Sequence, residues 1–382
     1  MAPPLTRRGR AVLALGVAVY VVAWVFGSQA LYPVAAGLVV AVLVAVVWVR
    51  ASTRAPSIRR HGLGNVLEGS DVRIRLEVAM RSLVPPPTLV AVERAGRLPE
   101  RNVEIKNGGG RYVLQEVRRG RYVFDPVRLS IEDPFALARV ELVKGESEAL
   151  VVYPRLVDLP ALFSEGGSHA QDGRRLLMRR PTGYELHSVR EHMQGESLRA
   201  VHWPSTARRG RLMVKELEDA PRDEVVVLLD ATDPAAFDVA VRAGGSILRT
   251  HVRRGRRCVL VINSAGRPVQ AVNSPGDWHR ALELLASAEP DGKTPLHALL
   301  QSAAGVAGRS LELIVVTSRV DGALADRLVQ RALSRRGASL VFIGETKEPQ
   351  LLRLQTAGIP VAVVRPGGDL AGQLAPQEAR VA

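Results

Sequence analysis

The sequence reads AVLALGVAVYVVAWVF at residues 11–26 and PVAAGLVVAVLVAVVWV at residues 33–49, with GSQALY between them. No charged residue occurs from Ala11 through Val49. A transmembrane helix needs about 20 mostly apolar residues to cross a hydrocarbon core of about 30 Å. Each run reaches that length once it takes its share of the connecting residues. We therefore expect residues 1–55 to form a hairpin of two membrane-spanning helices.

Arginines flank both ends of this hairpin, and the connection between the two runs is neutral. The flanking arginines are Arg7, Arg8 and Arg10 before the first run and Arg50, Arg54, Arg59 and Arg60 after the second. Short flanks rich in arginine stay on the cytoplasmic side of a membrane. The pattern predicts a multi-pass protein of the cell membrane with both termini in the cytoplasm. A cleaved signal peptide is the alternative, but a second span follows at once.

The net positive charge of the chain indicates which kinds of molecule it could bind. The chain has 382 residues and a formal net charge of +14, which suggests nucleic acid or an anionic membrane surface. The anionic cytoplasmic leaflet attracts such a chain. Aromatic residues make up 4% of the sequence, so stacking platforms for single-stranded nucleic acid are not evident. We expect a membrane association and no nucleic-acid partner.

The region after the hairpin has the pattern of an all-β domain, expected at residues 56–155. The stretch Val72–Val78 alternates apolar and polar residues, as a half-buried strand does. Short strands of this kind recur with Gly and Pro between them, which is typical of a β-sandwich. Residues 156–182, rich in Gly, Ser and Arg, are interpreted as a mobile linker.

The last part of the chain has an α/β pattern, expected within residues 183–370 and followed by a disordered tail at 371–382. Residues 225–230 form a continuous apolar run that ends in Asp230, typical of a parallel strand buried on both faces. Further strands are expected at 257–263, 311–318, 339–344 and 361–364, and helices at 237–252, 278–287, 296–304 and 323–336. This alternation predicts a Rossmann-like parallel sheet, whose ligands bind at the carboxyl ends of the strands.

Asp230 and Thr232 follow the first α/β strand and could offer oxygens to Mg²⁺, a hard cation. The pattern is similar to the D-x-S-x-S of a von Willebrand factor A domain, with Thr294 as the hydroxyl from a second loop. Pro234 stands where the second Ser belongs, and Arg319 would repel a cation. We interpret Asp230, Thr232 and Thr294 as a degenerate metal site. The alternative is an aspartate that caps the next turn.

The segment from Arg174 to Arg222 is basic and precedes the α/β core. Its arginines Arg190, Arg199 and Arg208 either anchor internal ion pairs or bind an acidic partner surface or a phosphate. The spacing of His187, His192 and His202 matches no zinc motif. Ser205 and Ser318 lack the G-x-S-x-G setting of a nucleophile. We predict no catalytic residue and treat the chain as a non-enzyme.

These residues resemble the domain of unknown function 58 family of prokaryotic membrane proteins. A central signature carries the resemblance: Arg190-Glu191, Gly195-Glu196, Arg199, Val201, Trp203 and Thr206-Ala207-Arg208. The stretches Gly120-Arg121-Tyr122, Asp133-Pro134-Phe135-Ala136-Leu137 and Val152-Tyr153-Pro154-Arg155 resemble the β-domain pattern of the family. The sequence departs from the family pattern at His192, Glu196, His202 and Pro234.

The resemblance implies a von Willebrand factor A-like fold in the α/β domain. It also implies a MoxR-type AAA+ ATPase as partner and a transglutaminase-like membrane protein as a further one. We therefore expect a scaffold or adaptor in the assembly or maturation of other proteins. Its expected partner-binding residues are Arg190, Glu191, Arg199, Trp203 and Arg208. The alternatives are a binder of anionic lipid or nucleic acid and a membrane-associated hydrolase.

Overall fold

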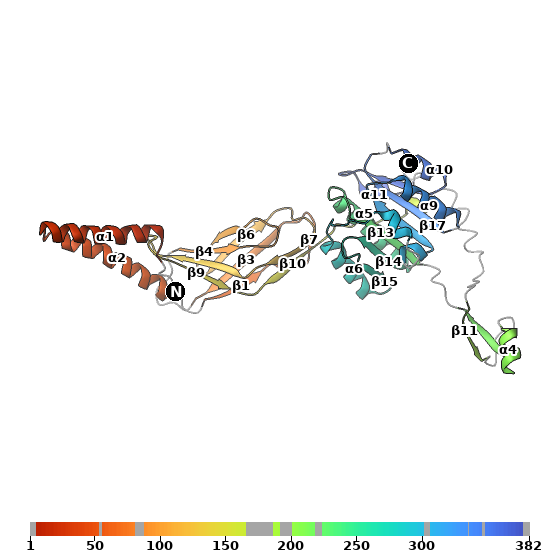
Figure 1. Cartoon of the computed structure of the whole chain (residues 1–382), viewed down its shortest axis with the longest axis horizontal. Coiled ribbons are helices and arrows are strands. Elements are labelled where there is room, and N and C mark those ends of the chain that lie inside the picture. The colour runs from red at the N-terminus through yellow and green to blue at the C-terminus, as the bar shows by residue number, and fades with distance from the viewer. Residues whose placement is uncertain are drawn as a thin grey trace. The chain divides into compact units, whose positions relative to one another are not determined.

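A computed structural model of the chain divides into two compact units, Met1–Arg155 and Leu156–Ala382 (Figure 1). The structure describes residues 5–52, 56–80, 88–165, 186–191, 201–217, 224–301, 306–334, 336–345 and 348–376. Each unit is considered by itself below.

The first unit begins with two long helices, α1 (Arg7–Phe26) and α2 (Leu31–Ser52). Helix α1 starts at the N-cap Thr6, whose side chain accepts a hydrogen bond from the Gly9 amide. It ends at Gly27, which has the left-handed backbone (φ 63°) that glycine adopts without strain. Both helices are long and apolar enough to cross a membrane.

These two helices bury small residues between them and expose large apolar ones, the reverse of the pattern in a soluble protein. The buried residues of α1 are Gly9, Gly16 and Ala23. A Cβ on Gly16 would lie 3.2 Å from side-chain atoms of Leu38 and Val39 on α2, so the helices approach closely at a small residue. The large apolar side chains of α1 instead point outward and are exposed, among them Leu15, Val17, Val21, Trp24 and Phe26. Small residues between helices and large apolar residues facing outward are typical of helices in lipid.

After these helices, the described residues of the first unit form ten strands in three sheets. The first sheet has the order β1 (Ser57–His61), β3 (Val72–Ala79) and β6 (Gly109–Leu114). The second has the order β2 (Val66–Leu67), β10 (Glu148–Tyr153) and β7 (Gly120–Phe124). The third has the order β5 (Arg101–Glu104), β4 (Thr88–Glu93), β8 (Val127–Glu132) and β9 (Arg139–Lys144). The predicted all-β content of this region is confirmed.

A buried ion pair lies inside these strands. Arg60 on β1 donates from Nε to Glu93 on β4 over 2.9 Å, and both side chains are at most 2% exposed. Arg60 also donates to Glu148 (3.2 Å) and to the Asp125 carbonyl (3.1 Å). The Tyr112 hydroxyl donates to the other oxygen of Glu93. A buried charge needs such partners, because an unpaired one costs several kcal/mol.

The second unit contains a six-stranded sheet with the order β15-β14-β13-β16-β17-β18. Its strands are β13 (Glu224–Asp230), β14 (Arg257–Asn263), β15 (Val269–Val272), β16 (Glu312–Thr317), β17 (Gly337–Ile343) and β18 (Val361–Val364). All neighbours are parallel except β14 and β15. The α/β class predicted from the continuous apolar runs is therefore confirmed.

Helices cover both faces of this sheet (Figure 1). One buried cluster contains residues of α5 (Phe237–Arg253), α6 (Pro275–Ser287) and α11 (Leu370–Leu374). The opposite cluster contains residues of α7 (Leu296–Gln301), α8 (Val306–Arg309), α9 (Gly322–Leu333) and α10 (Pro349–Thr356). Alternate side chains of the five parallel strands enter one cluster or the other, which explains why these strands are unbroken apolar runs in the sequence.

The first residues of the segment expected to be a linker pack on this sheet unit. Leu159, Leu162 and Phe163 are buried in the same cluster as α5. The Val157 amide donates to the Ser246 hydroxyl of α5 over 3.0 Å. The short 3₁₀ helix η1 (Phe163–Glu165) follows. The apolar residues of 156–163 thus belong to the α/β unit, which corrects the linker interpretation for that stretch.

Candidate functional site

The signature residues form a small substructure of two strands and one helix. Strand β11 (Leu186–Glu191) pairs antiparallel with β12 (Met213–Leu217), and α4 (Trp203–Arg209) lies between them in the sequence. Arg190 pairs in register with Val214, and Glu191 with Met213. Arg199 lies outside the described residues, so its predicted role is untested.

Some of the signature residues have a clear structural role. Val201 and Met213 are each 4% exposed. The His202 amide donates to the Met213 carbonyl over 2.7 Å, and the Thr206 hydroxyl accepts from the Met213 amide over 3.0 Å. His202 Nδ1 lies 2.8 Å from the Ser205 hydroxyl at the first turn of α4. These contacts fasten α4 to the start of β12.

Other signature residues face solvent. Trp203 opens α4 and is 64% exposed, and Arg208 in the last turn is also exposed. Burying the indole ring in the core would have contributed more to folding than leaving it in water. Tryptophan and arginine are the side chains that most often dominate the energy of a protein–protein interface. An exposed pair on one short helix therefore has the chemistry of a contact surface.

The second candidate site lies at the carboxyl end of the sheet, where β13, β14 and β16 end. Asp230 accepts hydrogen bonds from the Thr317 hydroxyl (2.7 Å), the Thr232 amide (3.2 Å) and the Asn263 side chain (3.4 Å). Asp230 and Asn263 are register partners on adjacent parallel strands. Both carboxylate oxygens of Asp230 are thus already hydrogen-bonded within the protein.

Thr294 approaches this cluster through its backbone. Asn263 Nδ2 donates to the Thr294 carbonyl over 2.7 Å, while Asn263 Oδ1 is buried and has no hydrogen-bond partner among the described residues. The Thr294 hydroxyl accepts a hydrogen bond from the Arg267 guanidinium, which is exposed. The loops of Asp230 and Thr294 therefore meet, but a fixed positive charge is bound to one of the predicted ligands.

These contacts do not fit a Mg²⁺ ligand set. Mg²⁺ takes oxygen ligands in an octahedron and prefers carboxylates. The unpartnered oxygen of Asn263 would suit a cation, but Asp230 is occupied and Arg267 supplies charge of the wrong sign. Within the described ranges, no three His, Cys, Asp or Glu residues lie close enough to share a metal ion.

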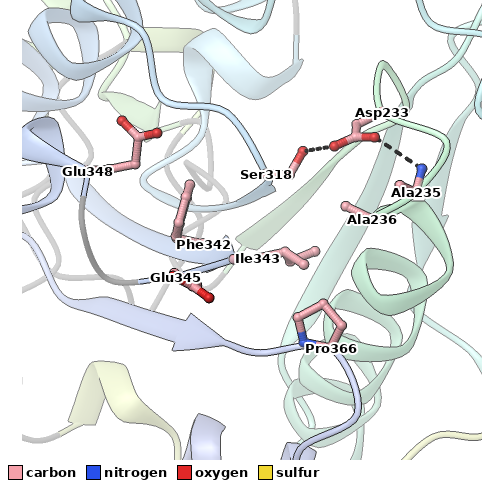
Figure 2. A pocket seen from close by; sticks show the side chains of 10 residues that line it. Asp233, Ala235, Ala236, Ser318, Phe342, Ile343, Glu345, Glu348 and Pro366 are labelled. Carbon is pink, nitrogen blue, oxygen red and sulfur yellow. Dashed lines mark hydrogen bonds between the residues drawn. The ribbon is translucent and has the colours of Figure 1, made fainter.

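A pocket of about 360 Å³ opens where β13, β16 and β17 end, at the same edge of the sheet (Figure 2). It is lined by Asp233, Ala235, Ala236, Ser318, Phe342, Ile343, Gly344, Glu345, Glu348 and Pro366. The Ser318 hydroxyl donates to Asp233 over 2.7 Å, as Figure 2 shows. This hydrogen bond, the Ala235 amide and the charge of Arg319 hold the pKa of Asp233 below its usual range. The pocket thus keeps an ionised carboxylate at neutral pH.

The chemistry available at this pocket is limited. Ser318 is hydrogen-bonded to a carboxylate, whereas a serine nucleophile needs a neighbouring general base such as histidine. Cys258 is buried, and burial raises its pKa to about 12, so its thiol stays protonated. The contact between Ser205 and His202 is local to one helix start and uses Nδ1, the nitrogen that a catalytic histidine usually offers to its orienting group.

Several residues of this edge were not identified from the sequence. Ser318 was placed on this edge from the sequence, together with Asp230. Asn263 and Thr317 each stand at the end of an apolar strand, as Asp230 does. That shared position is the signal that could have identified them. Asp233 and Arg267 lie in loops, where only the three-dimensional structure shows what they contact.

The fold and these sites define a protein with two apolar helices, a β-sheet region and an α/β domain that carries an exposed Trp–Arg segment. The family model described as "Protein of unknown function DUF58" matches residues 188–351. This match confirms the resemblance drawn from the signature.

The chain is also similar to the uncharacterized protein YeaD of Bacillus subtilis (strain 168). The two are 25% identical over 256 residues, which cover 65% of this chain and 62% of the relative. The chain thus matches less than two thirds of the length of that protein.

Among solved structures, a conjugative transposon lipoprotein from Bacteroides eggerthii is 15% identical, with a TM-score of 0.18. The CARDB domain of a Pyrococcus furiosus protein, in complex with di-metal ions, is 11% identical, with a TM-score of 0.19. The matches cover 25% of this chain in both cases, and 95% and 86% of the respective structures. At these scores they carry no argument about function.

Proposed function

We propose that this chain is a membrane-anchored, cytoplasm-facing scaffold or adaptor that binds another protein through its signature segment. The observation that carries the proposal is that some side chains of this segment stabilise its structure while others are exposed to solvent. His202 and Thr206 hold the substructure together, while Trp203 and Arg208 are exposed. Residues that serve no packing role and have the chemistry of interface anchors are best explained by a partner.

The proposed orientation rests on charge. Arg7, Arg8 and Arg10 are exposed at the start of α1, and Arg50 lies in the last turn of α2. Arginine-rich flanks on both sides of a neutral hairpin favour the cytoplasm for both termini. The two later domains would then face the cytoplasm.

The α/β domain is proposed to be von Willebrand factor A-like. Its strand order places β13 at the centre, with an antiparallel strand, β15, at one edge. Asp230 at the end of the central strand stands where that class of domain begins its ligand-binding motif. Pro234 has no side-chain oxygen, and the Arg267 guanidinium is hydrogen-bonded to Thr294. For these reasons the domain is proposed to contact a partner without a metal ion.

The proposed partner is a MoxR-type AAA+ ATPase, with a transglutaminase-like membrane protein as a further candidate. Both follow from the family resemblance. The test is a pull-down of a MoxR-type AAA+ ATPase from the same organism, using the full-length protein in detergent. Replacing Trp203 and Arg208 by alanine should reduce recovery at least tenfold, since each interface anchor contributes about 2 kcal/mol or more.

The matched control replaces a second exposed pair by alanine, Leu333 and Arg327 of α9. This variant should retain wild-type recovery. Equal recovery by all three proteins would refute the role of the signature segment.

A second candidate function, binding of anionic lipid or nucleic acid, is favoured by the net charge of +14. It predicts binding that falls steeply with salt and shows no partner selectivity. A partner bound equally well at low and high salt would exclude it.

A further inference from the structure

We propose that the turn at Asp133–Leu137 is a membrane-interface anchor, with Phe135 inserted among the lipid headgroups beside the start of α1. This inference rests on the membrane anchoring in the proposed function. It concerns a motif that the partner-binding segment leaves unexplained.

The turn is fastened directly to the start of α1. The Thr6 hydroxyl donates to the Ala136 carbonyl over 2.6 Å, and the Thr6 amide donates to the Leu137 carbonyl over 3.0 Å. Gly9 lies so close to the turn that a Cβ there would meet the Leu137 carbonyl oxygen at 2.0 Å. Leu5 and Ala138 form an isolated antiparallel bridge. The turn therefore lies level with the first turn of α1.

The turn is also rigid by its own contacts. Asp133 is 2% exposed and accepts hydrogen bonds from the amides of Phe135 (2.9 Å) and Ala138 (2.6 Å). The Asp133 amide donates back to the Ala138 carbonyl over 3.2 Å. Ala136 adopts a left-handed backbone (φ 55°), which turns the chain sharply. The Asp133 carboxylate is therefore buried inside the turn and is not part of its exposed surface.

Phe135 is the part of this turn that faces outward. Its side chain is 76% exposed, although its neighbour Leu137 is buried among the strands and α2. The turn that carries it is hydrogen-bonded to Thr6 at the start of α1. Arg7, Arg8 and Arg10 of that helix are exposed, and the apolar run starts one residue later. Arginines attract anionic headgroups, and aromatic rings gather at the same depth of a bilayer. A lipid interface is therefore the occupant that fits both the ring and its neighbours.

The other end of the hairpin supports the same placement. Ala45 and Val49, near the end of α2, are buried in one cluster with Leu137 and Ala138. Helix α2 also contacts strand β9, which begins two residues after the turn. The start of α1 and the end of α2 thus both meet this edge of the strands, so the edge must lie at the membrane surface if the helices cross it.

The test uses the full-length protein in liposomes of phosphatidylcholine and phosphatidylglycerol, with a nitroxide label on a single introduced cysteine. Phe135→Cys reports on the turn, Val17→Cys on the lipid-facing side of α1, and Val123→Cys on an exposed apolar position of β7. Wild-type protein is the labelling control, because its buried Cys258 should not react. The measurement is the collision ratio of oxygen to a water-soluble nickel chelate.

We expect the ratio at position 135 to be several-fold higher than at position 123 and lower than at position 17. A ratio at 135 equal to that at 123, with a high ratio at 17, would overturn the anchor while the helices still span the membrane; Phe135 would then be a site for a protein partner. A low ratio at 17 would refute the membrane anchoring and the anchor together.

Discussion

The hydrogen bond between Ser318 and Asp233 lowers the pKa of that carboxyl group. The two residues come from loops that follow β16 and β13, and the serine hydroxyl lies 2.7 Å from the carboxylate. A hydroxyl that donates to a carboxylate stabilises the ionised form and so lowers the pKa. Because the folded pKa of Asp233 is lowered, this contact stabilises the fold at neutral pH. The stabilisation is lost as the pH falls below about 3.9, the unfolded value, and through the folded pKa.

Replacing Ser318 by alanine should therefore raise the pKa of Asp233 toward the ordinary aspartate value. The Ala235 amide and Arg319 still lower it, so the return should be incomplete. The measurement is an NMR pH titration of the Asp233 carboxyl carbon in ¹³C-aspartate-labelled protein. Ser287→Ala is the control, because that hydroxyl donates to carbonyls of its own helix. An unchanged titration in Ser318→Ala would show that the hydrogen bond does not form in solution.

At the scale of elements, the buried Arg60–Glu93 pair joins β1 to β4, strands that belong to different sheets. Glu93→Gln keeps the shape but leaves the guanidinium without its main countercharge. Breaking a buried pair in this way costs about 3–5 kcal/mol. Equilibrium denaturation in detergent should show this loss in the first unit. Glu132→Gln, which breaks the more exposed pair with Arg139, should cost at most about 1 kcal/mol.

The double variant Arg60→Met, Glu93→Leu separates the pair from the packing around it. If the loss in Glu93→Gln comes from an uncompensated charge, removing both charges should recover much of the stability. A double variant less stable than Glu93→Gln would contradict that explanation.

The periodicity of apolar residues predicted many of these elements, because the repeat of a strand or helix determines which of its residues face the core. Val72–Ala79 alternates in the sequence and in the structure, and helix α5 was expected at 237–252 and runs from Phe237 to Arg253. Helix α6 begins at Pro275, three residues before the expected start, because Ser274 caps it and proline suits its first position. Of the helix expected at 296–304, the described part is α7 (Leu296–Gln301), and residues 302–304 lie outside the described residues.

The predictions failed where a residue's role depends on a distant partner. Arg60 is as polar in the sequence as its exposed neighbour Arg59, and only the pairing of strands brings it to Glu93. Asp230 was identified at the end of its strand, but its contact with Thr317, 87 residues away, was not. The close approach of Arg267 to Thr294 is likewise a property of two loops. Local sequence patterns do not encode such contacts.

At the scale of the whole molecule, the proposed partner binding raises the question of whether the α/β domain would use a metal ion for it. A von Willebrand factor A-like domain with Mg²⁺ would offer a cation to an acidic group of the partner. In this chain Arg267 already places a positive charge on Thr294, and Pro234 supplies no side-chain oxygen. We therefore expect recognition to proceed without a metal ion.

Thermal unfolding of the full-length protein with EDTA or with saturating MgCl₂ tests this expectation. A ligand at 100 times its Kd stabilises the folded state by about 2.7 kcal/mol, which would raise the Tm by about 5–10 °C. We expect the wild-type Tm to change by less than about 1 °C, since Asp230 is already satisfied by Thr317, Thr232 and Asn263. The variant Pro234→Ser, Arg267→Ala restores a hydroxyl and removes the guanidinium, so it should gain stability from Mg²⁺. A clear Mg²⁺-dependent shift in the wild type would instead establish a working metal site.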